Sequence, residues 1–138
     1  MADQSVNLRP GLYNVGSYQV SGIPFVTASL TAPALGATPL VITFPSVTKR
    51  VIVHNTNTSV DCRVGFSQNG VTGSNYFIAE SDKANNTSHQ FDMNVKCTKI
   101  YILSNGAALT SNISVAAELT GITGYDLAAS YSGSAGIG

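Results

Sequence analysis

The chain has 138 residues, of which 10% are charged and 43% are hydrophobic, and its formal net charge is zero. An average soluble domain carries about 25% charged residues, so Ser, Thr, Asn and Gly are expected to form much of this surface. The length fits one domain, the hydrophobic content argues against a disordered chain, and the neutral charge argues against nucleic-acid recognition, which needs a basic surface.

The N-terminus, MADQSVNLRP, lacks the apolar segment of a signal peptide, and no run of about 18 apolar residues occurs. We therefore expect no signal peptide, no secretion and no membrane span. The N-glycosylation sequons are then expected to stay unmodified. They begin at Asn57, Asn85, Asn86 and Asn112.

Residues 1–22 are expected to form an extended N-terminal arm, with a bend at Arg9-Pro10-Gly11 and a short extended piece at Gly16–Val20. The stretch VGSYQVSGIPFVTASL, residues 15–30, alternates like a strand and breaks at Gly22. Pro24 cannot donate a ladder hydrogen bond, so it predicts an edge strand or a strand start.

No charged residue occurs between Arg9 and Lys49. Exposed strand edges are usually protected by charge, so this uncharged edge is expected to be covered. Two interpretations remain open: an intramolecular extra strand, or coverage by another subunit.

The folded part is expected to span residues 23–120 and to be all-β. Period-two alternation is clearest in Asn112–Thr120, where Ile113, Val115, Ala117 and Leu119 share one face. Other segments, such as Leu40–Phe44 and Ile100–Leu103, are apolar on both faces and rich in β-branched residues. The predicted strands lie at about 23–30, 39–44, 48–55, 62–68, 75–80, 88–95, 98–104 and 111–120.

Helix is not expected, because no window places apolar residues at the i, i+3, i+4 and i+7 positions. Gln68-Asn69-Gly70 and Thr72-Gly73-Ser74 predict a loop. Eight strands at this spacing predict a single jelly-roll sandwich. An immunoglobulin-like sandwich is the nearest alternative, although the chain has no Trp. Residues 121–138 are expected to form a short Gly/Ser-rich C-terminal tail.

Catalytic candidates are few. His54 and His89 are expected to be hydrogen-bonded residues at strand ends rather than bases or metal ligands. Glu80 and Asp82 form a close acidic pair beside Lys83, which predicts a solvated turn. No catalytic motif, cofactor motif or metal-ligand spacing occurs, so we expect no enzyme, no cofactor and no metal site.

The two cysteines, Cys62 and Cys97, are too few for a disulfide framework. Free, partly buried thiols are the favoured interpretation, and a single bridge between neighbouring strands is the alternative.

The phrases LYNVGSYQVSGIPFVTAS, ITFPSVTKRVIVHN, CRVGFSQNGVTGSNYF and KIYILSN are similar to small structural proteins of large DNA viruses. The resemblance covers about residues 12–120. In that family, single jelly-roll domains form the pentameric vertex capsomer, or penton. The resemblance implies that sheet edges and end loops face neighbouring subunits and that the arm lies on the inner side of the shell.

We therefore expect a non-enzymatic virion structural protein, assembled inside the host cell, that forms a homopentamer and contacts other capsid proteins. A trimeric decoration, cement, fibre or tail-associated protein is one alternative. A carbohydrate-binding sandwich is another, with Tyr13, Tyr18, Tyr76 or Tyr101 as stacking platforms. The residues expected at subunit interfaces are Arg9, Tyr13, Tyr18, Pro24, Tyr125 and Tyr131.

Overall fold

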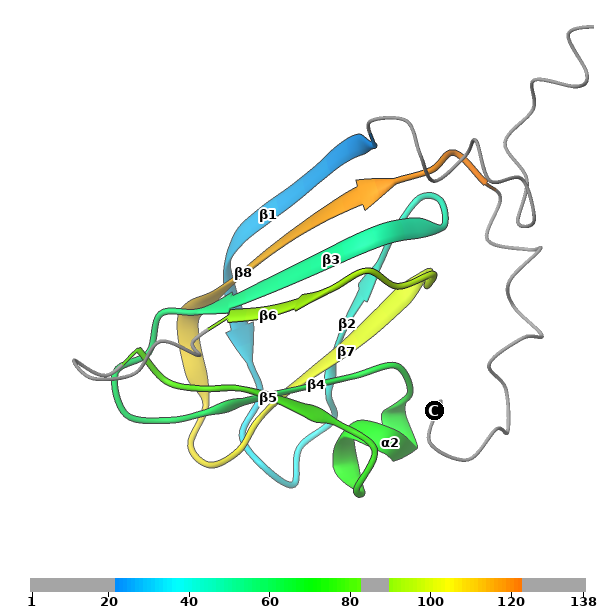
Figure 1. Cartoon of the computed structure of the whole chain (residues 1–138). Coiled ribbons are helices and arrows are strands. Elements are labelled where there is room, and N and C mark those ends of the chain that lie inside the picture. Colours follow the sequence, from blue (N-terminus) through cyan, green and yellow to red (C-terminus); the bar gives the residue numbers. More distant parts are fainter. Residues whose placement is uncertain (1–21, 83–89, 123–138) are drawn as a thin grey trace, which may run out of the picture.

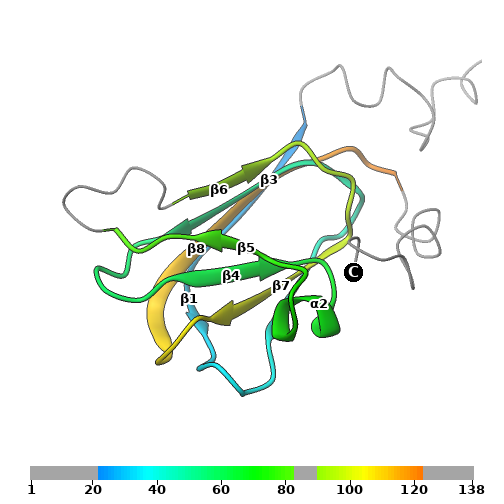
Figure 2. The same ribbon diagram turned by 60° about the horizontal axis from the view of Figure 1, so that its bottom comes forward.

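The computed structural model describes residues 22–82 and 90–122. They form two four-stranded antiparallel sheets that pack face to face, as Figures 1 and 2 show from two directions. The strands are β1 (Ile23–Ala32), β2 (Leu40–Thr43), β3 (Thr48–Asn55), β4 (Cys62–Gly65), β5 (Phe77–Ala79), β6 (Gln90–Met93), β7 (Lys99–Ser104) and β8 (Leu109–Leu119). The prediction of an all-β, two-layered fold is confirmed.

One sheet has the strand order β1-β8-β3-β6, and the other has the order β2-β7-β4-β5. The antiparallel pairs are nested along the chain: β1 pairs with β8, β2 with β7, β3 with β6, and β4 with β5. The strands β8 and β7 lie inside their sheets, where β8 also pairs with β3 and β7 also pairs with β4. The edges on one side of the sandwich are therefore β1 and β2, and on the other side they are β6 and β5.

The core lies between the sheets, and β8 shows most clearly how the sequence builds it. Its alternate residues Ile113, Val115, Ala117 and Leu119 are buried, as the alternation predicted, while the residues between them are more exposed. The opposing sheet contributes buried side chains in the same way. They include Ile42, Val64, Ile100 and Ile102.

Paired irregularities bend β1 and β8. Ser29 and Ser111 have positive φ angles of 57° and 56°, and the pairing register shifts on both sides of Leu30. The end of β1 then meets the end of β7, because the Ser104 N–H donates to the Pro33 carbonyl over 2.9 Å. The register gives β1 one extra residue between Thr27 and Leu30, which shifts its alternation, and gives β8 two extra residues between Leu109 and Ile113, which interrupt its alternation without shifting it. At these irregularities the predicted strands ended or began two residues short of the observed ones.

The expected loop after β4 contains a short helix, α2 (Gln68–Thr72), so the prediction of no helix is corrected at this point. The Ser67 side chain caps the helix by accepting a hydrogen bond from the Gly70 N–H over 2.9 Å. Serine is a favoured N-cap residue. A single turn buries only Gly70 and Val71, so it leaves no apolar periodicity in the sequence.

The predicted arm and tail lie outside the described residues, except for Gly22, Gly121 and Ile122. Ile122 is buried, and its carbonyl accepts a hydrogen bond from the Val47 N–H over 2.9 Å. Among residues 22–82 and 90–122, no helix is long and apolar enough to cross a membrane.

Candidate functional site

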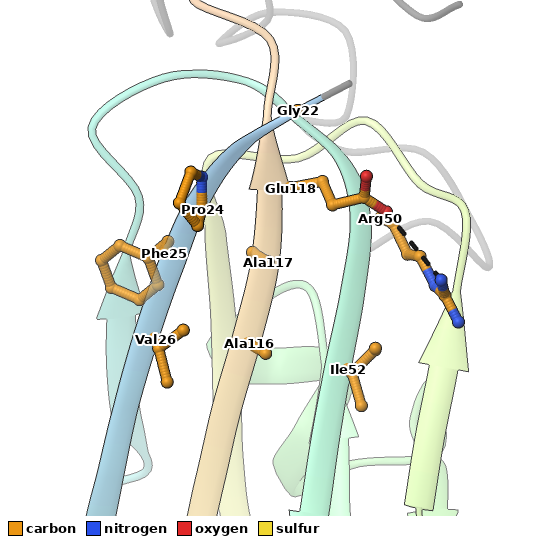
Figure 3. Close-up of a pocket in the computed structure, with 9 residues that line it drawn as sticks. All are labelled: Gly22, Pro24, Phe25, Val26, Arg50, Ile52, Ala116, Ala117 and Glu118. Atoms are coloured by element: carbon orange, nitrogen blue, oxygen red, sulfur yellow. Dashed lines mark ion pairs between the residues drawn. The ribbon is translucent and has the colours of Figure 1, made fainter. Parts of the chain in front are cut away.

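The outer face of the β1-β8-β3-β6 sheet carries an apolar trough, shown in Figure 3. The strand register builds it, because Val26 of β1 pairs with Ala116 of β8, which in turn pairs with Ile52 of β3. The next row along the strands consists of Pro24, Glu118 and Arg50. The trough has a volume of about 170 Å³.

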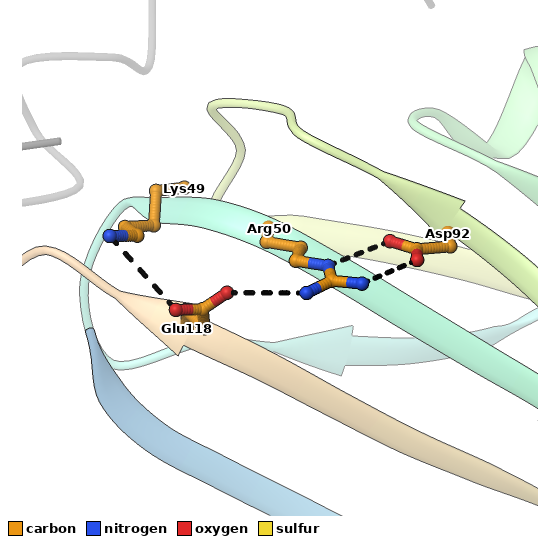
Figure 4. A network of polar contacts seen from close by, with 4 residues as sticks. All are labelled: Lys49, Arg50, Asp92 and Glu118. Atoms are coloured by element: carbon orange, nitrogen blue, oxygen red, sulfur yellow. Dashed lines mark hydrogen bonds and ion pairs between the residues drawn. The ribbon is translucent and has the colours of Figure 1, made fainter. Parts of the chain in front are cut away.

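A charged cluster borders the trough (Figure 4). The Arg50 guanidinium donates two hydrogen bonds to the Asp92 carboxylate, at 2.9 and 2.6 Å. Glu118 lies 3.9 Å from Arg50 Nη1 and 4.0 Å from Lys49 Nζ. The hydrogen bond from Arg50 lowers the pKa of Asp92, and the same bond raises the pKa of Arg50.

Lys49 and Arg50 form a doublet of basic residues in β3, and each of their side chains thus faces a carboxylate on a neighbouring strand. Exposed ion pairs of this kind contribute little to stability. The ion pairs also balance the two positive charges with two negative ones on this part of the outer face. The Lys49-Arg50 doublet is therefore poorly suited to binding a phosphate backbone.

Pro24 is the one expected interface residue that lies within residues 22–82 and 90–122. It is exposed in β1, the edge strand of its sheet, so the prediction of an edge position at this proline is confirmed. Residues 23–27 of β1 pair with β8 of the same chain. For this part of the segment 15–30, the structure therefore agrees with the interpretation of an intramolecular strand. On the other side of β1, no strand of the described ranges is paired with it.

The remaining expected interface residues lie outside the described residues. They are Arg9, Tyr13, Tyr18, Tyr125 and Tyr131.

A second depression opens between the sheets on the opposite side, where β5 and β6 form the edges. This aromatic cleft has a volume of about 210 Å³ and includes Phe66, Phe77, Phe91 and Met93 in its lining. The Phe77 and Phe91 ring centroids lie 5.7 Å apart, and those of Phe66 and Phe91 lie 6.5 Å apart. The cleft therefore exposes aromatic surface that is continuous with the core.

The residues considered for catalysis are not brought together. His54 lies half-buried in β3, where its register partners are Gln90 and Ser114, and His89 lies outside the described residues. Glu80 and Asp82 are both exposed. In the described ranges, no group of three or more His, Cys, Asp or Glu side chains could hold a metal ion.

Both cysteines are free and buried, so the favoured interpretation of free thiols is confirmed. Burial raises the pKa of Cys62 from 9.0 to about 12, and Asp61 adds to the shift. Burial also raises the pKa of Cys97 to about 11, although a hydrogen bond with Thr48 opposes the change. Neither thiol therefore has the character of a nucleophile.

The tyrosines considered as sugar platforms are only partly available. The Arg63 guanidinium lies 4.1 Å from the centre of the Tyr76 ring and covers one of its faces. Tyr101 is half-buried in β7. Tyr13 and Tyr18 lie outside the described residues.

Sequence reasoning missed the charged cluster and the aromatic cleft, because their members are far apart along the chain. Arg50 and Asp92 are separated by 42 positions. Alternation alone places Arg50, Asp92 and Glu118 in the phase opposite to the buried residues of their strands. It does not show that these three side chains meet, because that depends on the register between the strands.

The chain was compared with models of known protein families, with curated proteins and with solved structures, and none of the three comparisons found a match.

Proposed function

We propose that the chain is a non-enzymatic virion structural protein, a single jelly-roll subunit that self-associates into the pentameric capsid vertex. The nested strand pairs β1–β8, β2–β7, β3–β6 and β4–β5 support the jelly-roll assignment. A jelly roll consists of eight strands in two sheets joined as paired Greek keys, and it is common among viral capsid domains. The sequence resemblance to vertex proteins of large DNA viruses supports the same assignment.

The observation that carries the self-association proposal is the uncharged edge at β1. Residues 10–48 contain no charged side chain, and Val26 on this edge is 75% exposed. An extended, apolar edge strand is a hazard for a protein that works alone, and natural proteins usually protect it with charge. An edge that another subunit covers needs no such protection.

The neutral surface supports the same proposal. With seven basic and seven acidic residues, the chain has no net charge to keep copies apart. Packing against neighbours in a shell requires the burial of large surfaces, and each charge left out of those surfaces avoids a desolvation cost. Contacts with other capsid proteins would use the same edges and end loops.

The mass and symmetry of the assembled protein test this proposal. At micromolar to millimolar concentration, we expect particles of five times the 14.3 kDa chain mass, with five-fold symmetry in electron micrographs. Three-fold particles would favour the decoration or fibre alternative. A single chain at every concentration would contradict self-association altogether.

Deletion of residues 1–20 tests the role of the arm in the same assay. We expect the shortened chain to keep the β-rich circular dichroism of the parent, because the described sheets begin at Ile23, and to lose assembly. If the shortened chain assembled like the parent, the arm would have no role in the contacts, and if it failed to fold, the arm would belong to the core.

A further inference from the structure

The exposed large hydrophobic side chains of the described residues all lie at the two sides of the sandwich. One group is on β1, on β2 and on the turn between them, a region we call the β1/β2 flank. The other is on β5 and β6, the β5/β6 flank. The first group comprises Ile23, Val26, Leu35 and Val41, and the second comprises Phe77 and Met93. The inner strands β3, β4, β7 and β8 contribute none.

The two flanks differ in shape. At the β1/β2 flank the gap between the sheets is closed, because Phe25 of β1 packs edge-to-face against Phe44 with ring centroids 5.1 Å apart. Val26 lies beside this closed gap on the outer face of its sheet, where it lines the apolar trough. At the β5/β6 flank the gap is open as the aromatic cleft. A cavity of about 150 Å³ holds a benzene molecule, so this cleft of about 210 Å³ has room for an apolar side chain.

The free edge of β1 is poorly suited to pairing with the same edge of another copy. Pro24 lacks an N–H, so one donor of a continuous ladder is missing. Ser29, with φ of 57°, interrupts the strand five residues later. A two-fold contact that joins β1 to β1 would have to accommodate both irregularities twice, because each residue in such a contact has its symmetry mate opposite.

We propose that the β1/β2 flank of one copy packs against the β5/β6 flank of the next, with the β1 edge at Val26 lying over the aromatic cleft of its neighbour. This inference rests on the proposed self-association and names the surfaces that meet. The contact joins two different patches, so it is head-to-tail, and repetition closes it into a ring when the rotation between copies allows.

Two properties of the chain identify the occupant of the cleft as a second copy. First, the residues proposed to meet carry no charge: residues 23–43 contain none, and the cleft is lined by aromatic, aliphatic and uncharged polar side chains. The charged side chains that border the trough, Arg50, Asp92 and Glu118, pair with one another. Second, a copy that uses both flanks covers every exposed large hydrophobic side chain of the described residues. No contact with one flank alone achieves this.

A mixing experiment tests the proposal. The variant Val26→Asp places a charge on the β1/β2 flank and leaves the β5/β6 flank intact, and Phe77→Asp does the reverse. Each variant alone should associate at least about 30-fold more weakly than the parent chain, as expected for a contact at the centre of an interface. An equal mixture should form dimers of twice the 14.3 kDa chain mass and no larger species, because only one competent contact remains.

Thr58→Asp is the matched control, because Thr58 is exposed in the connection between β3 and β4 and belongs to neither flank. It should assemble like the parent. Circular dichroism melting confirms that each variant is folded, and Met93→Lys replaces Phe77→Asp if the latter unfolds.

The outcomes separate the two proposals. If the parent chain stays monomeric, self-association fails and this inference fails with it. If the parent assembles but the mixture yields only monomers, only the head-to-tail contact is overturned. Normal assembly of either variant alone also overturns it, because the contact would then be two-fold through the intact flank or would lie elsewhere.

Discussion

The two phenylalanines of the aromatic cleft allow one substitution to be compared in two environments. Phe91 in β6 is 2% exposed and Phe77 in β5 is 59% exposed, although their ring centroids lie only 5.7 Å apart. Replacing either with alanine removes the same atoms. Any difference between the two decreases in the free energy of unfolding therefore reflects the different burial of the two rings within a single chain.

The expected magnitudes follow from burial. Phe91→Ala removes a fully buried ring and leaves a cavity, so it should lower the free energy of unfolding by about 3–5 kcal/mol. Phe77→Ala removes a ring that is already more than half exposed and leaves no enclosed cavity, so it should cost about 1 kcal/mol. Small domains have only about 5–15 kcal/mol in total, so the first variant should be close to unfolding.

Urea unfolding followed by circular dichroism measures both values. The protein concentration must be low enough that sedimentation shows single chains, because association would add more stability to the parent than to Phe77→Ala, whose substituted ring lies on the β5/β6 flank. Equal losses for the two variants, or a larger loss for Phe77→Ala, would refute the assignment of Phe91 to the core and of Phe77 to the surface.

Three further predictions concern the core, the thiols and the entry to β1. Ile113→Ala should lower the free energy of unfolding by about 2–5 kcal/mol, because Ile113 is fully buried; a loss below about 1 kcal/mol would contradict its place between the sheets. Cys62 and Cys97 should resist a thiol reagent at pH 8 until urea unfolds the chain. Folding raises the pKa of Cys62 from 9.0 to about 12 and that of Cys97 from 9.0 to about 11. The contribution of the two protonated thiols to the free energy of unfolding should therefore be complete below pH 9 and decline as the pH rises toward these values. Rapid labelling of the folded chain at pH 8 would contradict the burial of the two thiols. Gly22→Ala should cost about 1–3 kcal/mol, because the added Cβ would lie 2.5 Å from the Glu118 Cβ; unchanged melting would show that the entry to β1 can shift freely.

The sequence predicted the fold best where alternation and burial agree. The expected strand at 48–55 has the bounds of β3, and the buried phase of β8 was read correctly from Ile113 to Leu119. Prediction was poorer where local geometry changes the phase. At Ser29 a bulge shifts the alternation of β1, and at Ser111 two extra residues interrupt the alternation of β8. Neither residue is a glycine that would have marked the position.

The helix α2 could not be predicted, because a single capped turn has no periodicity to detect. The site shows the same division between local and long-range signals. Pro24 could be placed at an edge from its missing N–H alone. The neutralisation of Arg50 could not be predicted, because it requires the register of β3 with two strands that come much later in the chain.

The most direct test of the account is backbone hydrogen exchange across a dilution series. If other copies cover the two flanks, amides in β1, β5 and β6 should exchange more slowly as the protein concentration rises. Amides in β3, β7 and β8, which are paired on both sides within the chain, should exchange at the same rate throughout. Exchange in β1, β5 and β6 that is independent of concentration would contradict the claim that sister subunits cover these edges.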